Sequence, residues 1–197
     1  MVEQQMTAEQ FAETRHELPD GGRWTELVHG VPHSQDPPDE IHGNVVLNLS
    51  KKLADVVQQH AANPPGYACF DLGLIVARQP DVVRFPAVSF FTEGNRFSMI
   101  DEIISELCPQ LVMEIASSNL RRREMNQRIQ EYHRFGVDQV WVLDTSETSL
   151  HICKPNASVQ SFPGKEIFRD DSVLPDFELT VEKLFSPPDW WMDGKAN

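Results

Sequence analysis

The clearest candidate for chemistry is Glu114, a carboxylate at the middle of the apolar run QLVMEIA. A carboxylate in a buried strand is costly unless it pairs with a cation or binds a metal, so its position alone indicates a site. The helix expected after this strand carries Arg128 and Tyr132 four residues apart, and therefore on one face. Because a strand, a capped turn, a helix and a second strand follow one another, we expect Glu114 and Arg128 to meet.

Arginines at the start of the same helix are the candidate surface for nucleic acid. Arg121, Arg122 and Arg123 are consecutive, and Arg128 and Arg134 follow on the same segment. The formal charge of the chain is −13 at pH 7, and this opposes DNA binding because Lys and Arg supply most non-specific affinity for phosphates. Any DNA-binding surface must therefore be local. A solvated helix start is the alternative interpretation of the three arginines.

The elements that position these residues begin with a helix and a strand. Thr7-Ala8-Glu9-Gln10 has the form of a capping box and predicts a short helix from about Thr7 to Glu17. The segment RWTELVHG predicts a strand that ends in a turn at Gly30. A long helix up to about His60 is indicated by apolar residues that recur every four positions, namely Ile41, Val45, Leu49, Leu53 and Val57.

Two extended runs come next, YACFDLGLIVA and VVRFPAVSFF. Arg78-Gln79-Pro80-Asp81 between them suits a turn, so the two runs predict a hairpin. A polar, irregular piece from Thr92 to about Cys108 leads to the run around Glu114. That run is mostly apolar, which predicts a strand covered on both faces at the centre of the sheet.

The remaining segments complete an α/β sandwich with a mixed sheet. Ser117-Ser118-Asn119 offers N-cap chemistry for a helix from about Leu120 to Phe135, closed by Gly136. DQVWVLD predicts a buried strand, SLHICKP and ASVQSF predict edge strands, and LTVEKLF predicts a short final helix. We expect one domain over residues 1–197, with an N-terminal helix in residues 1–20 and a polar tail at residues 186–197. Trp190 and Trp191 in that tail would pack on the domain or on a second subunit.

The order of six motifs resembles the Uma-two family, a large bacterial group of restriction-endonuclease-like proteins assigned to the PD-(D/E)XK nuclease superfamily. The motifs are TELVHG, His42-Gly43, RFPAVSFF, MEIASSNLRRREMNQRIQEY, GVDQVWVLD and LPDFELTVEKLF. They span nearly the whole chain from Glu26 to Phe185. The resemblance implies a restriction-endonuclease-like fold, a mixed β-sheet flanked by helices, in a bacterial cytoplasmic protein.

The resemblance also implies Mg²⁺-dependent hydrolysis of a phosphodiester bond in DNA. In the family's pattern an aspartate and a glutamate hold the metal, and a lysine on the following helix steers or activates the attacking water. In this chain the glutamate is Glu114, the aspartate position is Ala87 and the lysine position is Arg128. Glu26 matches a further glutamate of the family and is expected to join Glu114 as a metal ligand.

Two of these positions depart from the pattern, and both departures weaken the expected chemistry. Replacing an aspartate ligand by Ala87 leaves Glu114 with little hold on Mg²⁺, which proteins bind through one or two carboxylates. Arg128 keeps the positive charge but cannot accept a proton, although it can still clamp a phosphate.

Few other acids of the chain are placed to replace the missing aspartate. A hairpin turning about Gln79 and Pro80 places Ala87 opposite Leu72 and puts Asp71 on the other face, unless a bulge reverses the register. Glu93 lies about 20 Å further along an extended strand, and Ser89 is a poor metal ligand. Glu26 is therefore the best remaining candidate.

Other residue patterns carry weaker signals. His29 and His33 flank Gly30 and Pro32 in a turn, which disfavours a metal site, and His42 is either part of the site or a helix-start histidine bonded to a backbone carbonyl. Tyr132 and Trp141 are expected in the core rather than as platforms for stacked bases. The three cysteines have no paired spacing, and no apolar stretch is long enough for a membrane span, so we expect reduced thiols and a cytosolic location.

Three hypotheses follow. The first is a nuclease fold whose catalytic residues have decayed, so that DNA hydrolysis is weak or absent. The second is an active endonuclease in which Glu26 and Glu114 share the metal and Arg128 replaces the lysine. The third is a non-enzymatic binding or assembly module, which the acidic charge favours. We also expect a homo-oligomer, such as a dimer, because cleavage of a duplex usually needs two sites.

Overall fold

The computed structural model describes residues 5–94, 102–170 and 172–188. The strands form two large sheets and a small ribbon. The six-stranded sheet has the order β11-β10-β9-β8-β6-β3, and its strands in chain order are β3 (Tyr67–Phe70), β6 (Val88–Phe91), β8 (Leu111–Ala116), β9 (Gln139–Asp144), β10 (Ser149–Cys153) and β11 (Gln160–Pro163).

The five-stranded sheet has the order β2-β1-β5-β4-β7. Its strands are β1 (Thr25–Val28), β2 (Val31–Ser34), β4 (Gly73–Ala77), β5 (Val82–Arg84) and β7 (Ile104–Ser105). The ribbon pairs β12 (Ile167–Asp170) with β13 (Phe177–Thr180). Within the described residues the α-helices are α1 (Ala8–Thr14), α2 (Glu40–Gln59), α3 (Asn119–Phe135) and α4 (Glu182–Phe185), and 3₁₀ turns cover Arg15–Glu17 and Pro19–Gly22.

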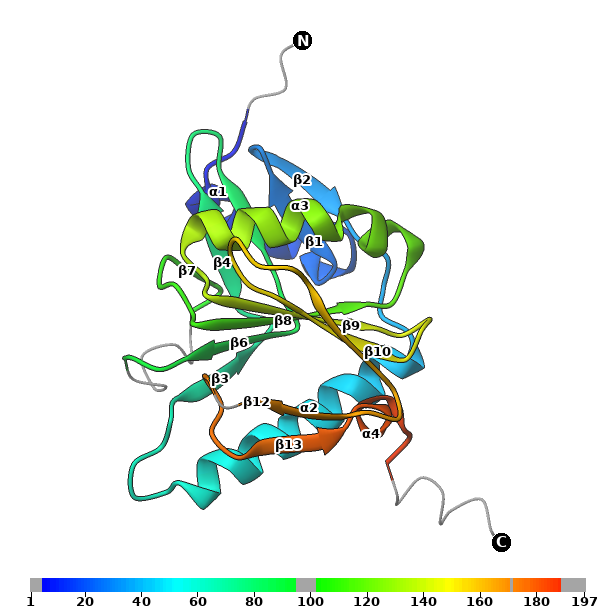
Figure 1. Ribbon diagram of the computed structural model, residues 1–197. Helices are drawn as coiled ribbons and strands as arrows, with labels where there is room; N and C mark the ends of the chain where they lie inside the picture. Colours follow the sequence, from blue (N-terminus) through cyan, green and yellow to red (C-terminus); the bar gives the residue numbers. More distant parts are fainter. Residues whose placement is uncertain (1–4, 95–101, 171, 189–197) are drawn as a thin grey trace, which may run out of the picture.

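Two long helices cover the two faces of the six-stranded sheet (Figure 1). The stripe of α2, which includes Val45, Leu49 and Leu53, packs against Met113 and Trp141 in one core. On the opposite face, α3 contributes a second core, formed with alternate residues of β8 and β9. The layered α/β fold with mixed sheets flanked by helices is therefore confirmed.

The structure confirms several local predictions. Thr7 caps α1 through a capping box with Gln10. Ser118 caps α3 by accepting a hydrogen bond from the backbone N–H of Arg121, and Gly136 ends the helix at a φ of 114°. β8 lies at the interior of its sheet, between β6 and β9, with parallel pairing to β9. Tyr132 and Trp141 are both fully buried.

The hairpin prediction is right in outline and wrong in detail. Each extended run divides into two strands: β4 and β5 pair in the five-stranded sheet, and β3 and β6 pair in the six-stranded sheet. A β-bulge between Ile75 and Ala77 moves the register by one residue. Phe70 consequently pairs with Val88, so Asp71, rather than Leu72, is the next residue to face Ala87.

Other differences lie at the periphery. The N-terminal α-helix ends at Thr14, where the chain tightens into 3₁₀ turns. SLHICKP was expected at an edge, but β10 is interior because β11 pairs with it, and β2 and the β12-β13 ribbon were not anticipated. Leu179 and Thr180 belong to β13 rather than to the final helix. Part of the irregular piece after Thr92, together with Trp190 and Trp191, lies outside the described residues.

The apolar stripe of α2 provides the first test. Leu49 is fully buried, whereas Ile41 on the same predicted stripe is 41% exposed. We expect Leu49→Ala to lower the free energy of unfolding by about 3 kcal/mol through lost burial and a cavity. Ile41→Ala is the matched control and should cost less than about 1 kcal/mol. Urea denaturation measures both, and equal losses would contradict this packing of α2.

Candidate active site

Glu114 points to the α3 side of β8 because side chains alternate along a strand. Leu111, Met113 and Ile115 belong to the core that packs against α2. Val112 and Ala116 belong to the core on the α3 side, and Glu114 shares their alternation. The carboxylate is therefore buried beneath a helix, with no exposed surface, and its charge needs partners supplied by the protein.

Arg128 is the main partner of Glu114. It lies on the buried face of α3 and is itself 0% exposed. Its Nε and Nη2 donate to Oε1 of Glu114 at 2.9 and 2.6 Å. Tyr132, one turn further along α3, donates its hydroxyl to the same oxygen. The predicted meeting of the strand carboxylate and the helix cation is thus present in the structure.

Glu26 brings the five-stranded sheet to the same point. Arg128 donates from Nη1 to Oε2 of Glu26 at 2.5 Å and from Nη2 to Oε1 at 2.9 Å. Oε2 of Glu26 also accepts from Nη1 of Arg84 at 2.9 Å, and Oε1 of Glu26 accepts from the backbone N–H of Phe85 at 3.0 Å. One guanidinium therefore bridges carboxylates from β1 and β8, which belong to different sheets.

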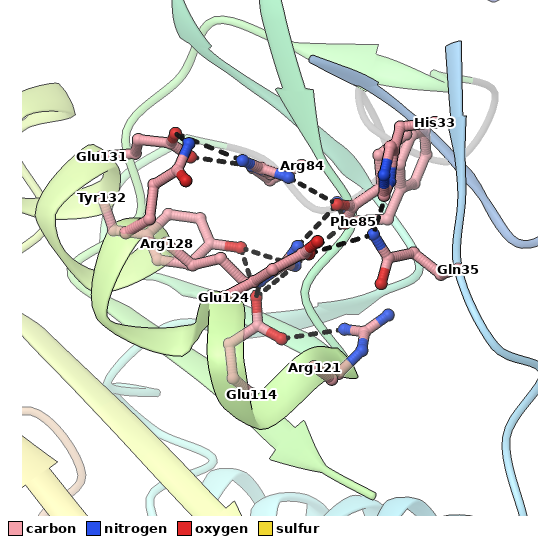
Figure 2. Close-up of polar contacts among 12 residues, drawn as sticks. His33, Gln35, Arg84, Phe85, Glu114, Arg121, Glu124, Arg128, Glu131 and Tyr132 are labelled. Atoms are coloured by element: carbon pink, nitrogen blue, oxygen red, sulfur yellow. Dashed lines mark hydrogen bonds and ion pairs between the residues drawn. The ribbon is translucent and has the colours of Figure 1, made fainter. Parts of the chain in front are cut away.

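Two more side chains complete what we call the ion network (Figure 2). Arg121 donates to Oε2 of Glu114 at 3.0 Å. Glu131 accepts from Nε of Arg84 at 2.7 Å and from Gln127 at 2.8 Å. The ion network thus balances three acids with three guanidinium groups: Glu26, Glu114 and Glu131 with Arg84, Arg121 and Arg128. Removing one member would leave an uncompensated buried charge.

The ion network holds its charges strongly. Burial by itself raises the pKa of Glu26, but Arg128 and Arg84 outweigh burial and hold the pKa of this carboxyl well below its usual range. Burial lowers the pKa of Arg128, and Glu114 and Glu26 more than reverse that effect, so this pKa lies well above that of a free arginine. Burial also keeps the pKa of Tyr132 high, so its hydroxyl remains a donor.

A small polar cavity of about 40 Å³ opens beside the ion network, with room for about two or three water molecules. Glu26, Arg121 and Ala87 line it together with Asp71 and His42. His42 bonds through Nδ1 to the hydroxyl of Ser117 at 3.2 Å, rather than to a backbone carbonyl. Burial and then Arg121 lower the pKa of this imidazole, which favours its neutral form.

The residues at this site do not match a Mg²⁺ site. Mg²⁺ requires carboxylate oxygens with free lone pairs in near-octahedral geometry. Each oxygen of Glu26 and Glu114 already accepts a charged donor. Ala87 supplies no ligand, and the described part of the chain contains no cluster of three or more acidic, His or Cys side chains arranged to hold a metal. The expected metal-ligand roles of Glu26 and Glu114 therefore stay predictions.

The arginines expected to contact DNA have different surroundings. Arg121 bonds to Glu114, and Arg122 bonds to Asp144 at 3.1 Å. Arg123 is exposed. Of the three, Arg123 is therefore the one with no carboxylate partner among the residues that the structure describes.

Two members of the ion network were missed from the sequence, and one acid was misplaced. Arg84 interrupts the apolar run VVRFP just as Glu114 interrupts LVMEIA, and this parallel could have identified it. Glu131 follows Arg128 by three residues on the same helix face. Asp71, expected on the far face, lines the cavity with Ala87 because the bulge in β4 shifts the register.

A larger hollow of about 800 Å³ lies between α2 and β3. Among the described residues its lining is mainly apolar and contains no carboxylate, imidazole or basic side chain; it includes Leu53, Val57, Ala61, Pro64 and Phe70. Phosphodiester chemistry needs charged or metal-binding groups, so the smaller cavity beside Ala87 is the candidate site.

No helix in the described ranges has the length and hydropathy needed to cross a membrane.

Comparisons with known proteins agree with this architecture. The model of the Uma2 family, described as "Putative restriction endonuclease", matches residues 9–182. A crystal structure described as "a putative nuclease belonging to DUF820 from Anabaena variabilis" superimposes with a TM-score of 0.71 at 19% identity. The match covers 91% of this chain and 97% of that one, which shows a shared fold. None of the curated proteins compared with the chain matches it.

The depressed pKa of Glu26 predicts a specific dependence of stability on pH. An unfolded glutamate has a pKa of about 4.3, so the unfolded chain takes up a proton at a pH where folded Glu26 remains ionised. The stability that ionised Glu26 contributes is therefore complete above the unfolded pKa. It is lost as the pH falls towards the lower pKa of the folded state. Glu26→Gln should cost about 3 kcal/mol at pH 7 and flatten the decline in stability below about pH 5.

Urea denaturation at several pH values measures both effects. Glu178→Gln is a matched control, because Glu178 belongs to an exposed pair with Arg169 and should contribute no more than about 1 kcal/mol. An equal loss of unfolding free energy in the two variants would contradict a stabilising role for the ion pairs of Glu26.

Proposed function

Because this chain belongs to the Uma2 family of restriction-endonuclease-like proteins, we propose that it is a nuclease-fold protein whose Mg²⁺-dependent hydrolysis of DNA has been lost. One observation carries the proposal: Arg128, where the family pattern has lysine, bonds to both Glu26 and Glu114. The first of the three hypotheses drawn from the sequence is therefore the one that the geometry supports best.

A metal would have to displace Arg128 to reach these acids. The guanidinium is fully buried and contacts Glu26 and Glu114 at 2.5 and 2.6 Å. Arginine stays protonated at every accessible pH, so it cannot leave the acids by losing its charge. Moving it would strand a cation in the protein interior, which costs several kcal/mol.

The two substituted positions also remove the catalytic groups themselves. At Ala87 a methyl group replaces a carboxylate, and the cavity there loses a ligand. Arg128 is a poor proton acceptor, so it cannot activate water as a general base. These arguments weigh against the active alternative in which Glu26 and Glu114 share a metal.

A binding or assembly role is the second candidate, and a surface observation favours it. Arg121 and Arg122 are engaged by Glu114 and Asp144, and the whole chain has a formal charge of −13. These two arginines are therefore not free to neutralise phosphates, and the net negative charge opposes DNA binding. A homodimer that uses the fold as a scaffold is consistent with this balance.

Plasmid nicking tests the loss of hydrolysis. We expect supercoiled DNA incubated with Mg²⁺ or Mn²⁺ to be cut no faster by the wild-type chain than by Glu114→Gln, because the acids are occupied by Arg128. The variant purified in the same way controls for contaminating nucleases. Metal-dependent nicking that disappears with Glu114→Gln would establish an active enzyme and refute the proposal.

DNA affinity tests the second candidate. The logarithm of the binding constant falls with the logarithm of salt concentration by about 0.9 for each neutralised phosphate in duplex DNA. Arg123 is exposed and has no ion-pair partner among the described residues, so Arg123→Ala should reduce the magnitude of the slope by about 1. Arg122→Ala is the matched control and should leave the slope unchanged. A slope steeper than about −4 would reveal a basic surface, and light scattering in parallel reports self-association.

A further inference from the structure

The outer edge of β3 lacks the usual protection against pairing with another strand. An edge strand offers unpaired N–H and C=O groups, and proteins shield such edges with proline, charged side chains or very short strands. At the other edges of the two large sheets, β2 contains Pro32, β11 ends in Pro163 and β7 has two residues. The four residues of β3 include neither proline nor charge, and among the described strands β3 pairs with β6 alone (Figure 1).

An exposed aromatic ring on β3 adjoins the hollow between α2 and β3. Phe70 is 40% exposed and lines this hollow together with Gly66 and Ala68. Ala68 packs into the core on the α2 side, and Phe70 points the same way because side chains alternate along a strand. Gly66 carries no side chain, and none would fit, because a Cβ there would lie 2.1 Å from the carbonyl oxygen of Phe91. One short segment therefore holds both an exposed ring and an unfilled space.

We propose that two copies of this chain associate through β3, with the two strands antiparallel, so that their six-stranded sheets become continuous. A two-fold axis perpendicular to the sheet keeps both α2 helices on one face and requires one residue of β3 to pair with its own counterpart. With Ala68 at the axis, Phe70 of each copy lies opposite Gly66 of the partner and covers part of the partner's hollow. The exposed ring and the unfilled space then satisfy each other twice, as an isologous interface requires.

The charge of the chain favours this edge as the place where two copies meet. Each copy has a formal charge of −13, so most approaches of two copies bring carboxylates together and are repulsive. Among the described residues the hollow is lined without any charged side chain, and β3 itself has none. Two copies can therefore approach through β3 without placing like charges in contact.

The small size of the contact makes the dimer weak. A four-residue strand and a pair of rings lie at the low end of interface size, below about 1,200 Å² in total, which is typical of transient complexes. We therefore expect the dimer to dissociate on dilution. The inference goes beyond the loss of hydrolysis, because β3 pairing does not involve the ion network and the outcome of plasmid nicking does not bear on it.

Sedimentation velocity over a series of protein concentrations tests the pairing. The proteins are the wild-type chain, Phe70→Lys, which places a charge on the edge, and Val159→Lys. Val159 is the matched control because it is 58% exposed and precedes β11, at the opposite edge of the same sheet. Circular dichroism confirms that each protein is folded.

We expect the weight-average mass of the wild-type chain and of Val159→Lys to rise from 22.4 kDa towards twice that value as the concentration increases. Phe70→Lys should weaken association at least about tenfold, as expected for an aromatic anchor of an interface. A wild-type chain that stays monomeric throughout, or a dimer that Phe70→Lys leaves intact, would overturn the proposal. Saturable binding of the uncharged probe N-phenyl-1-naphthylamine by a monomeric wild-type chain, lost in Ala68→Trp, would make a small molecule the occupant of the hollow and overturn it as well.

Disulfide cross-linking tests the register. In a chain that carries Cys69→Ser, Ala68→Cys places two thiols directly opposite each other, at the Cβ separation of about 4.5–5.5 Å typical of cross-strand pairs, and mild oxidation should give a covalent dimer. Val159→Cys in the same background should stay monomeric, and it controls for Cys108 and Cys153, which both proteins keep. No covalent dimer, or equal yields from the two proteins, would refute the pairing of Ala68 with its counterpart. If Phe70→Lys does not fold, this comparison decides the proposal.

Discussion

The bridge from Arg128 to Glu26 and Glu114 is the interaction on which the rest of the structure depends. It joins β1 in one sheet to β8 in the other through a side chain of α3. All three groups are almost completely removed from solvent. Since a buried carboxylate is tolerated only with a partner, the packing of α3 between the two sheets and the ionisation of both acids require each other.

The ion network also explains why arginine rather than lysine suits this arrangement. The guanidinium presents several donors in a plane, so one side chain can satisfy oxygens from two directions at once. Arg84 makes a second bridge of this kind, between Glu26 and Glu131. The buried acids are therefore balanced by guanidinium groups and help to hold the two sheets together. The same hydrogen bonds occupy the carboxylate lone pairs that a metal ion would use.

Family and fold say less about activity than the site does. A TM-score of 0.71 at 19% identity establishes a common arrangement of elements, but one fold supports many functions. Ala87 and Arg128 are two positions in a chain of 197. Their side chains alter both the ligand count and the accessible protonation states of the site, so they bear on chemistry far more than on the fold.

The sequence by itself determined those features that depend on local spacing. The apolar run around Glu114 predicted a buried acid, and the four-residue spacing of Arg128 and Tyr132 placed them on one face of α3, because both patterns are local. Only the tertiary structure decided that Glu26 shares Arg128 with Glu114, that Arg84 and Glu131 complete the balance, and that Asp71 lines the cavity with Ala87. Those facts depend on a bulge that shifts the register by one residue and on the docking of two sheets, and neither is encoded in the spacing of any one segment.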